Sequence, residues 1–310
     1  MSQESIDSMS ECRNCGSNNL VELGFIGLVA PFFLKRVFNM ELNVPVSPYP
    51  IKQLIRTLGK PLNFFFSRVY PEKAFIGMQI CSRCSFVQAR DPFPEDWITR
   101  LYLDYRSETY NTERIRYEPT YKDIAARVGT DEVEVAHRLE AATLFLSDKL
   151  ERSPEFTMLD YGGADGRFLP NLSERRFVYE ISDVAPIPGI ERIASEDSLG
   201  QYSYVHLAHV LEHVVHPLKL VKHVTEFLEP RGYLYIEVPQ EITDANLLRL
   251  QHGATDIAVG IHEHINSYSP AALTHLMNEV GLDVIAIEAT PVDVGWATAV
   301  HLRALGRKSS

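Results

Sequence analysis

The chain has few cysteines, no long apolar run and no excess of basic residues, and each absence excludes a class of protein. Only four of its 310 residues are cysteine, which is too few for a disulfide framework in a chain of this length. No uncharged apolar stretch of about 18 residues is present, so we predict no transmembrane helix and no integral membrane association. The polar N-terminal stretch 1–11 has no apolar core and does not resemble a secretory signal. We therefore expect a cytoplasmic protein.

The net charge of the chain excludes a further class of protein. Acidic residues number 41 and basic residues 30, giving a net charge of −11, which argues against general affinity for nucleic acid. Residues 21–75 depart from this balance, with seven basic and three acidic side chains. Such a segment could make peripheral contact with a membrane surface or with an anionic substrate such as a nucleotide diphosphate. The alternative is a pair of amphipathic helices that pack on the main domain.

The chain divides into four segments. Residues 1–11 are expected to be a disordered tail, residues 12–90 a small cysteine-bracketed domain with a long insertion, and residues 91–150 a helical connector or lid. In 151–310, strand candidates alternate with helices, which predicts an α/β domain with a mostly parallel sheet covered on both faces. Two final strand candidates with no helix between them predict an antiparallel hairpin at one edge.

The cysteines form two CxxC pairs, Cys12 with Cys15 and Cys81 with Cys84. Two such turns can supply four thiolates at tetrahedral geometry, so we predict a Zn²⁺ site. With four protein ligands and no open position, its role would be structural. Four reduced, unligated cysteines are the alternative. Redox dithiols are disfavoured because neither pair opens a helix after a strand.

A glycine-rich stretch, DYGGADG, runs from Asp160 to Gly166 and is expected to follow a strand and open a short helix. Glycine lets the backbone pass close to a ligand and adopt a positive φ. An acid before the first glycine would repel a pyrophosphate but attract the amino group of S-adenosylmethionine, which favours a methyl donor over NAD. The predicted cofactor residues here are Asp160, Gly162, Gly163, Asp165 and Gly166. A turn that binds nothing is the alternative.

Further acids follow at the positions where a nucleoside would be held. Asp183, after the second strand, can accept hydrogen bonds from the ribose hydroxyls, with Glu180 as competing candidate. Asp197 can bind the adenine amino group, with Glu196 as alternative. Each could instead be a solvated loop carboxylate. His209 opens HVLEHVVHP at the end of the fourth strand, where α/β sheets gather ligand-binding residues.

The segments HVLEHV, LEPRGYLYIEVP, EHINSYS and YLDYRSETYN, together with the CxxC pairs, resemble class I S-adenosylmethionine-dependent methyltransferases, and most of all the zinc-binding sugar C-methyltransferases. The resemblance covers residues 12–20 and 78–310. It implies a Rossmann-like domain with a seven-stranded sheet and a small-molecule acceptor, a nucleotide-activated sugar in that family. It also implies that His213 lies near the transferred methyl group, that Glu263 and His264 stand where the catalytic base is found, and that Tyr105 reaches the substrate.

Two departures from that family leave the target atom open. Ile261 stands where the sugar enzymes carry a tyrosine, and the chain stops before their further C-terminal domain. A histidine suits deprotonation of a weakly acidic acceptor, so His264 is the first choice of base and His213 the second, with Glu263 orienting the site. Transfer to oxygen of a sugar or other metabolite is the alternative, and a zinc-stabilised binding module without catalysis is a further one. A metal held by His252, His262, Glu263 and His264 is disfavoured.

Overall fold

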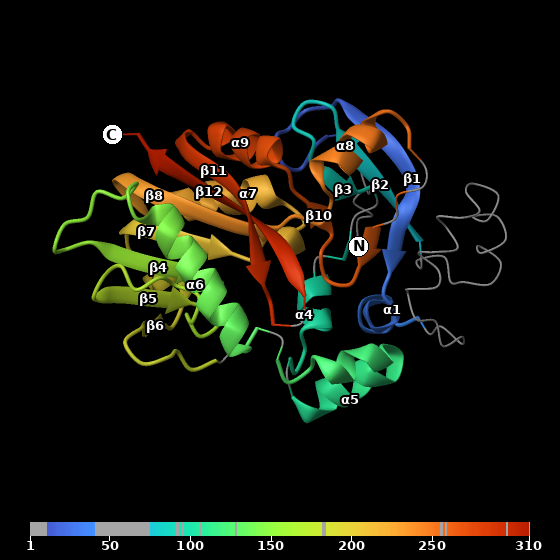
Figure 1. Ribbon diagram of the computed structural model, residues 1–310, viewed down its shortest axis with the longest axis horizontal. Coiled ribbons are helices and arrows are strands. Elements are labelled where there is room, and N and C mark those ends of the chain that lie inside the picture. The colour runs from blue at the N-terminus through green and yellow to red at the C-terminus, as the bar shows by residue number, and fades with distance from the viewer. Residues whose placement is uncertain are drawn as a thin grey trace, which may run out of the picture. The chain divides into compact units, whose positions relative to one another are not determined.

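The computed structural model describes residues 11–40, 75–90, 93–94, 96–105, 107–127, 129–181, 184–254, 257, 259–295 and 297–309 (Figure 1). The chain forms two compact units, Met1–Val128 with Ile242–Ser267, and Gly129–Glu241 with Tyr268–Ser310. Two boundaries differ from the expected segments. The helix over Glu132–Leu146 belongs to the second unit, and Ile242–Ser267 leaves the C-terminal region to join the first.

The second unit is built on a seven-stranded mixed sheet, as expected. Its order is β11-β12-β8-β7-β4-β5-β6. The strands are β4 (Thr157–Tyr161), β5 (Arg175–Tyr179), β6 (Glu191–Ile193), β7 (Tyr202–Ala208), β8 (Leu228–Pro239), β11 (Leu282–Asp293) and β12 (Thr298–Lys308). The strands from β6 to β8 run parallel, and β11 and β12 form the predicted antiparallel hairpin at one edge.

The strand order reverses at β4, and this reversal decides where a ligand can bind. From β4 the chain proceeds to β5 and β6 on one side, then to β7 and β8 on the other. In open α/β sheets ligands bind at such a switch point, outside the carboxyl ends of the strands. All five residues of β4 are buried, as expected for a central parallel strand covered on both faces.

Helices cover both faces of this sheet. Helix α6 (Glu132–Leu146) packs Ala142 and Phe145 against Met158 and Leu305, and Figure 1 shows it crossing in front of the strands. On the other face lie α7 (Pro217–Val224) and α9 (Pro270–Glu279). The cap of α9 was predictable: the Ser269 hydroxyl accepts a hydrogen bond from the Ala272 N–H, and Pro270 occupies the first helical position.

The helix expected after the glycine-rich stretch does not form. Residues 162–174 join β4 to β5 through turns only. Pro170 lies in the middle of this segment and lacks the N–H that a helix would use, and the Leu169 N–H already closes a tight turn onto the Gly166 carbonyl. The cofactor loop is therefore a set of turns held by the strands beside it.

The first unit contains a smaller sheet of order β10-β3-β2-β1-β9. Its strands are β1 (Leu20–Val29), β2 (Phe75–Cys81), β3 (Val87–Ala89), β9 (Val259–Ile261) and β10 (Asn266–Ser267). Its helices are α1 (Pro31–Phe38), α4 (Trp97–Leu101), α5 (Glu108–Tyr117) and α8 (Asp244–Gln251). Both edge strands come from the segment 242–267, which explains why this segment joins the unit. The rings of Phe33, Phe93 and Trp97 pack within 6 Å of one another in its core, with Phe33 stacked on Trp97 and edge-on to Phe93.

Across the described ranges of both units, no helix is long and apolar enough to cross a membrane. Most of the basic segment 21–75 falls outside the described residues, as does the N-terminal tail up to residue 10. The expectations of a peripheral contact and of a disordered tail therefore stay predictions.

Candidate functional site

The glycine-rich loop leaves β4 at the switch point and adopts backbone conformations that need glycine. Gly162 and Gly166 have φ angles of 74° and 78°. Ala164 also has a positive φ, 52°, which is uncommon for a residue with a side chain. A Cβ added at Gly162 would lie 3.0 Å from the side chain of Val210, and one at Gly166 would lie 2.6 Å from Ile190. The loop therefore packs closely against Val210 and Ile190. We call the backbone turn formed by residues 162–166 the glycine cradle.

Asp160 lies beneath this cradle. Its side chain is 1% exposed, and among the residues that the structure describes neither carboxylate oxygen has a hydrogen-bond partner. Burial raises the pKa of Asp160 to about 8, and the nearby Arg138 acts in the opposite direction. A buried carboxylate without partners fits a site that receives a cationic group, such as the ammonium of a methionine moiety.

Two other acids hold the loop. The Ala164 N–H donates to Oε2 of Glu180 at 3.0 Å, and Glu180 directly follows β5. Asp165 forms an ion pair with the guanidinium of Arg167 and is 7% exposed, so its carboxylate organises the loop from within. Asp183, the expected ribose ligand, lies outside the described residues.

The acids expected near adenine lie on a short 3-10 turn, Glu196–Ser198. Glu196 accepts a hydrogen bond from the hydroxyl of Tyr161, and Nε2 of His223 lies 3.1 Å from the same carboxylate. Asp197 is exposed. The two carboxylates therefore differ: Glu196 is engaged by its neighbours, and Asp197 faces solvent.

His209 follows β7 and has a φ of 56°. Its Nε2 lies 3.4 Å from Oε1 of Glu237 and 3.4 Å from Nδ1 of His301. Glu237 is 2% exposed, accepts a hydrogen bond from Arg138 Nε at 2.9 Å, and accepts another from the Tyr235 hydroxyl at 2.7 Å. Burial alone would raise the pKa of Glu237, but Arg138 holds it well below the usual value. A buried, ionised carboxylate thus lies at the carboxyl edge of the sheet.

His213 lies on the 3-10 turn Leu211–His213 that follows His209. Its Nε2 is 3.9 Å from the buried carboxylate of Glu212, and its side chain is 16% exposed. Of the four predicted catalytic residues it is the one in the second unit; Tyr105, Glu263 and His264 belong to the first.

Within the first unit, Glu263 is the centre of a partly buried polar cluster. Nη1 of Arg114 lies 2.5 Å from Oε1 of Glu263, and the Tyr102 hydroxyl donates to Oε2 at 2.7 Å. Tyr105 packs edge-on against Tyr102, with ring centroids 4.9 Å apart. Burial and then Glu263 raise the pKa of Tyr102 well above its usual value, so this phenol is a hydrogen-bond donor. The structure thus brings Tyr105 and Glu263 together through Tyr102.

The four cysteines come together, as predicted. Cys12 and Cys15 form a turn ahead of β1, Cys81 ends β2, and Cys84 lies in the turn before β3; all four are buried. Antiparallel pairing of Leu20 with Cys81 sets the two turns side by side. The Sγ atoms of Cys12 and Cys84 are 3.7 Å apart, and those of Cys15 and Cys81 are 3.8 Å apart. Sulfurs at about 2.3 Å from one Zn²⁺ would be about 3.8 Å apart, so the cluster fits zinc.

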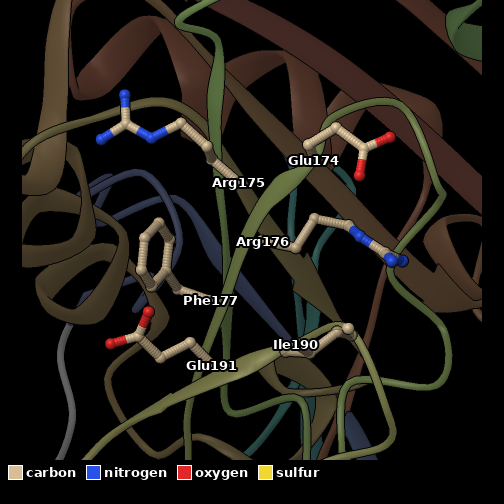
Figure 2. Close-up of a pocket in the computed structure, with 7 residues that line it drawn as sticks. Glu174, Arg175, Arg176, Phe177, Ile190 and Glu191 are labelled. Carbon is tan, nitrogen blue, oxygen red and sulfur yellow. The ribbon is translucent and has the colours of Figure 1, made fainter.

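A surface groove of about 670 Å³ lies elsewhere, at the amino ends of β5 and β6. Figure 2 shows Arg175 and Phe177 projecting to one side of β5 and Arg176 to the other. Because ligands of α/β sheets bind at the carboxyl ends of the strands, this groove is at the wrong end for the cofactor.

Sequence reasoning missed several residues of these clusters, among them Arg114, Glu237 and His301. The charged side chain of Glu237 in the otherwise apolar run YLYIEVP was an available signal, because a buried strand rarely carries an unpaired acid. No local pattern marked Arg114 or His301.

Residues 132–287, which are 156 of the 310 residues, match a family described as a methyltransferase domain. A search of curated proteins found no significant match.

Several solved structures are similar in fold. The 1,6-didemethyltoxoflavin-N1-methyltransferase of Burkholderia thailandensis is 14% identical with a TM-score of 0.46 and covers 78% of this chain and 99% of its own. A possible histamine N-methyltransferase of Thermotoga maritima is 14% identical with a TM-score of 0.42, covering 63% and 98%. The N-methyltransferase NodS of Bradyrhizobium japonicum is 15% identical with a TM-score of 0.39, covering 62% and 99%.

Structural similarities with TM-scores this low add no weight to the assignment of a family to this chain. The assignment rests on the family match and on the strand order. That match spans α6 and the strands from β4 to β8, including the glycine cradle and the switch point. The chain therefore belongs to the methyltransferase-domain family, and its larger sheet has the strand order of a Rossmann-like fold.

Proposed function

We propose that this methyltransferase binds S-adenosylmethionine in the glycine cradle and transfers its methyl group to a small, sugar-derived acceptor. The observation that carries the cofactor site is the buried carboxylate of Asp160, which has no hydrogen-bond partner among the described residues and lies under the loop at the switch point. When bound, the cofactor supplies an electrophilic methyl group on a sulfonium, and the protein mainly has to align donor and acceptor.

Each part of the cofactor has a candidate partner. We assign the methionine ammonium to Asp160 and the backbone of Gly162, Gly163 and Gly166 to the cradle beside it. We assign the ribose hydroxyls to Glu180, because it directly follows the second strand of the parallel set and already touches the loop. Asp197 is preferred for the adenine amino group, since Glu196 is engaged by Tyr161 and His223.

We propose His264 as the base that takes a proton from the acceptor. Glu263 is a weaker candidate for that role because its ion pair with Arg114 stabilises the ionised form and its hydrogen bond from Tyr102 occupies the other oxygen. Glu263 would instead orient its neighbours, and Tyr105, packed on Tyr102, would contact the acceptor. His213 is the second choice of base.

The nature of the acceptor rests on the resemblance to sugar C-methyltransferases. Ile261, which stands where those enzymes carry a tyrosine, is fully buried in β9, and a Cβ at Gly27 would lie 2.9 Å from it. Ile261 therefore provides no hydroxyl where those enzymes have one. This difference favours a second candidate function, methyl transfer to a hydroxyl oxygen.

We also infer that the cysteine cluster binds one structural Zn²⁺, because the Cys12–Cys84 and Cys15–Cys81 sulfur separations match a tetrahedral site and all four sulfurs lie within 4.8 Å of one another. The ion would join the two turns that bracket β1 and β2.

The test is an assay with S-adenosylmethionine and nucleotide-activated deoxysugars, followed by NMR of the product to locate the new methyl group. His264→Asn should abolish turnover while cofactor binding persists, and His252→Asn, at an exposed histidine of the same unit, should not. Unchanged turnover in His264→Asn would remove it from the role of base. Binding of cofactor without turnover on any acceptor would favour a non-catalytic binding module.

A further inference from the structure

Three side chains from separate strands converge at the carboxyl edge of the large sheet: His209 after β7, Glu237 on β8 and His301 on β12. Their facing atoms, Nε2, Oε1 and Nδ1, form a nearly equilateral triangle. The sides are 3.4 Å from His209 to Glu237, 3.4 Å from His209 to His301, and 3.2 Å from His301 to Glu237.

The two separations of 3.4 Å are long for direct hydrogen bonds, which centre near 2.9 Å, and the separation of 3.2 Å lies at the upper end of their range. They equal the spacing of ligand atoms around a divalent ion, because atoms about 2.0–2.1 Å from Zn²⁺ lie about 3.4 Å apart at tetrahedral angles. Two imidazoles and one carboxylate are also a ligand set that leaves one coordination position open. We propose that His209, Glu237 and His301 bind a divalent transition-metal ion, zinc foremost, at a site separate from the cysteine cluster.

Neighbouring groups support each ligand. Oε1 of Glu212, a buried carboxylate, lies 3.5 Å from Nδ1 of His209, on the side of the ring away from the triangle. The Tyr235 hydroxyl donates to Oε2 of Glu237, the oxygen that does not face the histidines. A donor behind a carboxylate is a usual outer partner of a metal ligand, where it fixes the ligand's orientation. At 3.5 Å the Glu212 carboxylate acts on His209 through its charge, which favours a cation beside the ring.

The surrounding charges tolerate a cation. Arg138 and Arg303 lie beside Glu237, with their Nε atoms 2.9 Å and 3.0 Å from its two oxygens. Arg138 is in turn 3.4 Å from Glu134, and Glu212 adds a third carboxylate. Together with Glu237 there are therefore three carboxylates and two guanidinium groups around the site. Oε1, the oxygen that faces the histidines, also accepts the hydrogen bond from Arg138, and a carboxylate oxygen has a second lone pair for a metal. Oε2 keeps Tyr235 and Arg303.

The site lies beside the cofactor loop. His209 precedes Val210, whose side chain touches the position of a Cβ on Gly162. His209 is also the ligand that reaches the surface, with 26% of its side chain exposed against 2% for Glu237 and His301. If the proposed function holds, an oxygen or nitrogen of the acceptor can take the open coordination position from the exposed side of His209. The metal would then lower the pKa of that acceptor group.

The full-length chain, stripped of metal, would be titrated with zinc against a chromophoric chelator. We expect the wild type to take up one equivalent more than His209→Gln, and His137→Gln, at an exposed histidine of α6, to match the wild type. Tyr235→Phe keeps all three ligands and should weaken this equivalent roughly 10- to 100-fold. Circular dichroism would establish that each variant is folded.

Equal zinc uptake by the wild type and a folded His209→Gln would overturn the proposal and make the trio a metal-free hydrogen-bonded network. Because the readout is a difference in metal uptake, it does not depend on the cysteine cluster. Binding of S-adenosylhomocysteine to metal-free protein, measured separately by calorimetry, shows whether the cofactor site stands independently of this metal.

Discussion

A methyl group on Gly163 would lie 2.0 Å from Cγ of Asp160, so the loop backbone rests directly on the buried carboxylate. Gly163→Ala must therefore displace either the loop or Asp160. We expect a loss of about 1–3 kcal/mol in the free energy of unfolding and a large loss of cofactor affinity. Gly200→Ala is the matched control, since a Cβ at Gly200 has no neighbour within 4 Å. Equal behaviour of the two variants in urea unfolding would contradict the packing described.

Burial of Asp160 predicts a pH dependence of stability. Its pKa is about 8 in the folded chain and about 4 in an unfolded one. Between these values the folded state holds a proton that the unfolded state has released, so this group makes stability fall as pH rises, by at most about 1.4 kcal/mol per pH unit. Asp160→Asn should be progressively more stable than the wild type from about pH 5 to about pH 7.5. A constant difference between the two across that range would show that Asp160 is not protonated there.

Glu180 is expected to bind the ribose, because it follows β5 and accepts from the Ala164 N–H. Glu180→Gln keeps the shape and the loop contact but loses the charge, so affinity for S-adenosylmethionine should fall roughly 10- to 100-fold. Asp183→Asn provides the comparison, since Asp183 is the rival ribose ligand. A larger loss of affinity in Asp183→Asn, measured by calorimetry, would reverse the assignment.

Arg114 and Glu263 form an ion pair with little exposure, 9% for the arginine side chain and 19% for the glutamate. Arg114→Met would remove the guanidinium that pairs with both Glu263 and Glu118, so we expect a loss of about 3 kcal/mol in stability. Arg116→Met, at an exposed arginine of the same helix α5, should cost far less. Similar losses in both variants on urea unfolding would indicate that the pair is not formed.

Zinc in the cysteine cluster predicts a metal-dependent first unit. Cys81→Ser should lose one equivalent of zinc and unfold at a lower temperature, because the turns that carry Cys12 and Cys84 are no longer joined. Ser82→Ala, at the exposed neighbouring residue, should keep both metal and stability. A chelator should lower the melting temperature of the wild type towards that of Cys81→Ser. Metal-free wild type that melts at the same temperature as zinc-loaded protein would contradict a structural role.

Features with local signals could be predicted from the sequence. Ser269 and Pro270 mark the start of α9, and short apolar runs separated by turns mark the strands of the large sheet. The cysteines also came together as predicted, because each CxxC pair is a local turn and one register of β1 with β2 joins them.

Features that depend on tertiary pairing could not be predicted from the sequence. Tyr102 and Glu263 meet although they are 161 positions apart, and Glu237 meets His301 only because β12 inserts antiparallel beside β8. The missing helix after the glycine loop had a different cause: a glycine-rich loop after a strand was expected to open a helix, but Pro170 and the tight turn at Gly166 prevent it.

The most direct test of the central claim is calorimetric titration of S-adenosylhomocysteine into the wild type, Asp160→Asn and Gly200→Ala. We predict one binding site per chain in the wild type and in Gly200→Ala, and markedly weaker binding in Asp160→Asn, which keeps the fold but removes the buried carboxylate. Absence of any heat of binding to folded wild-type protein, or equal affinity in all three chains, would contradict the cofactor site built on Asp160 and the glycine cradle.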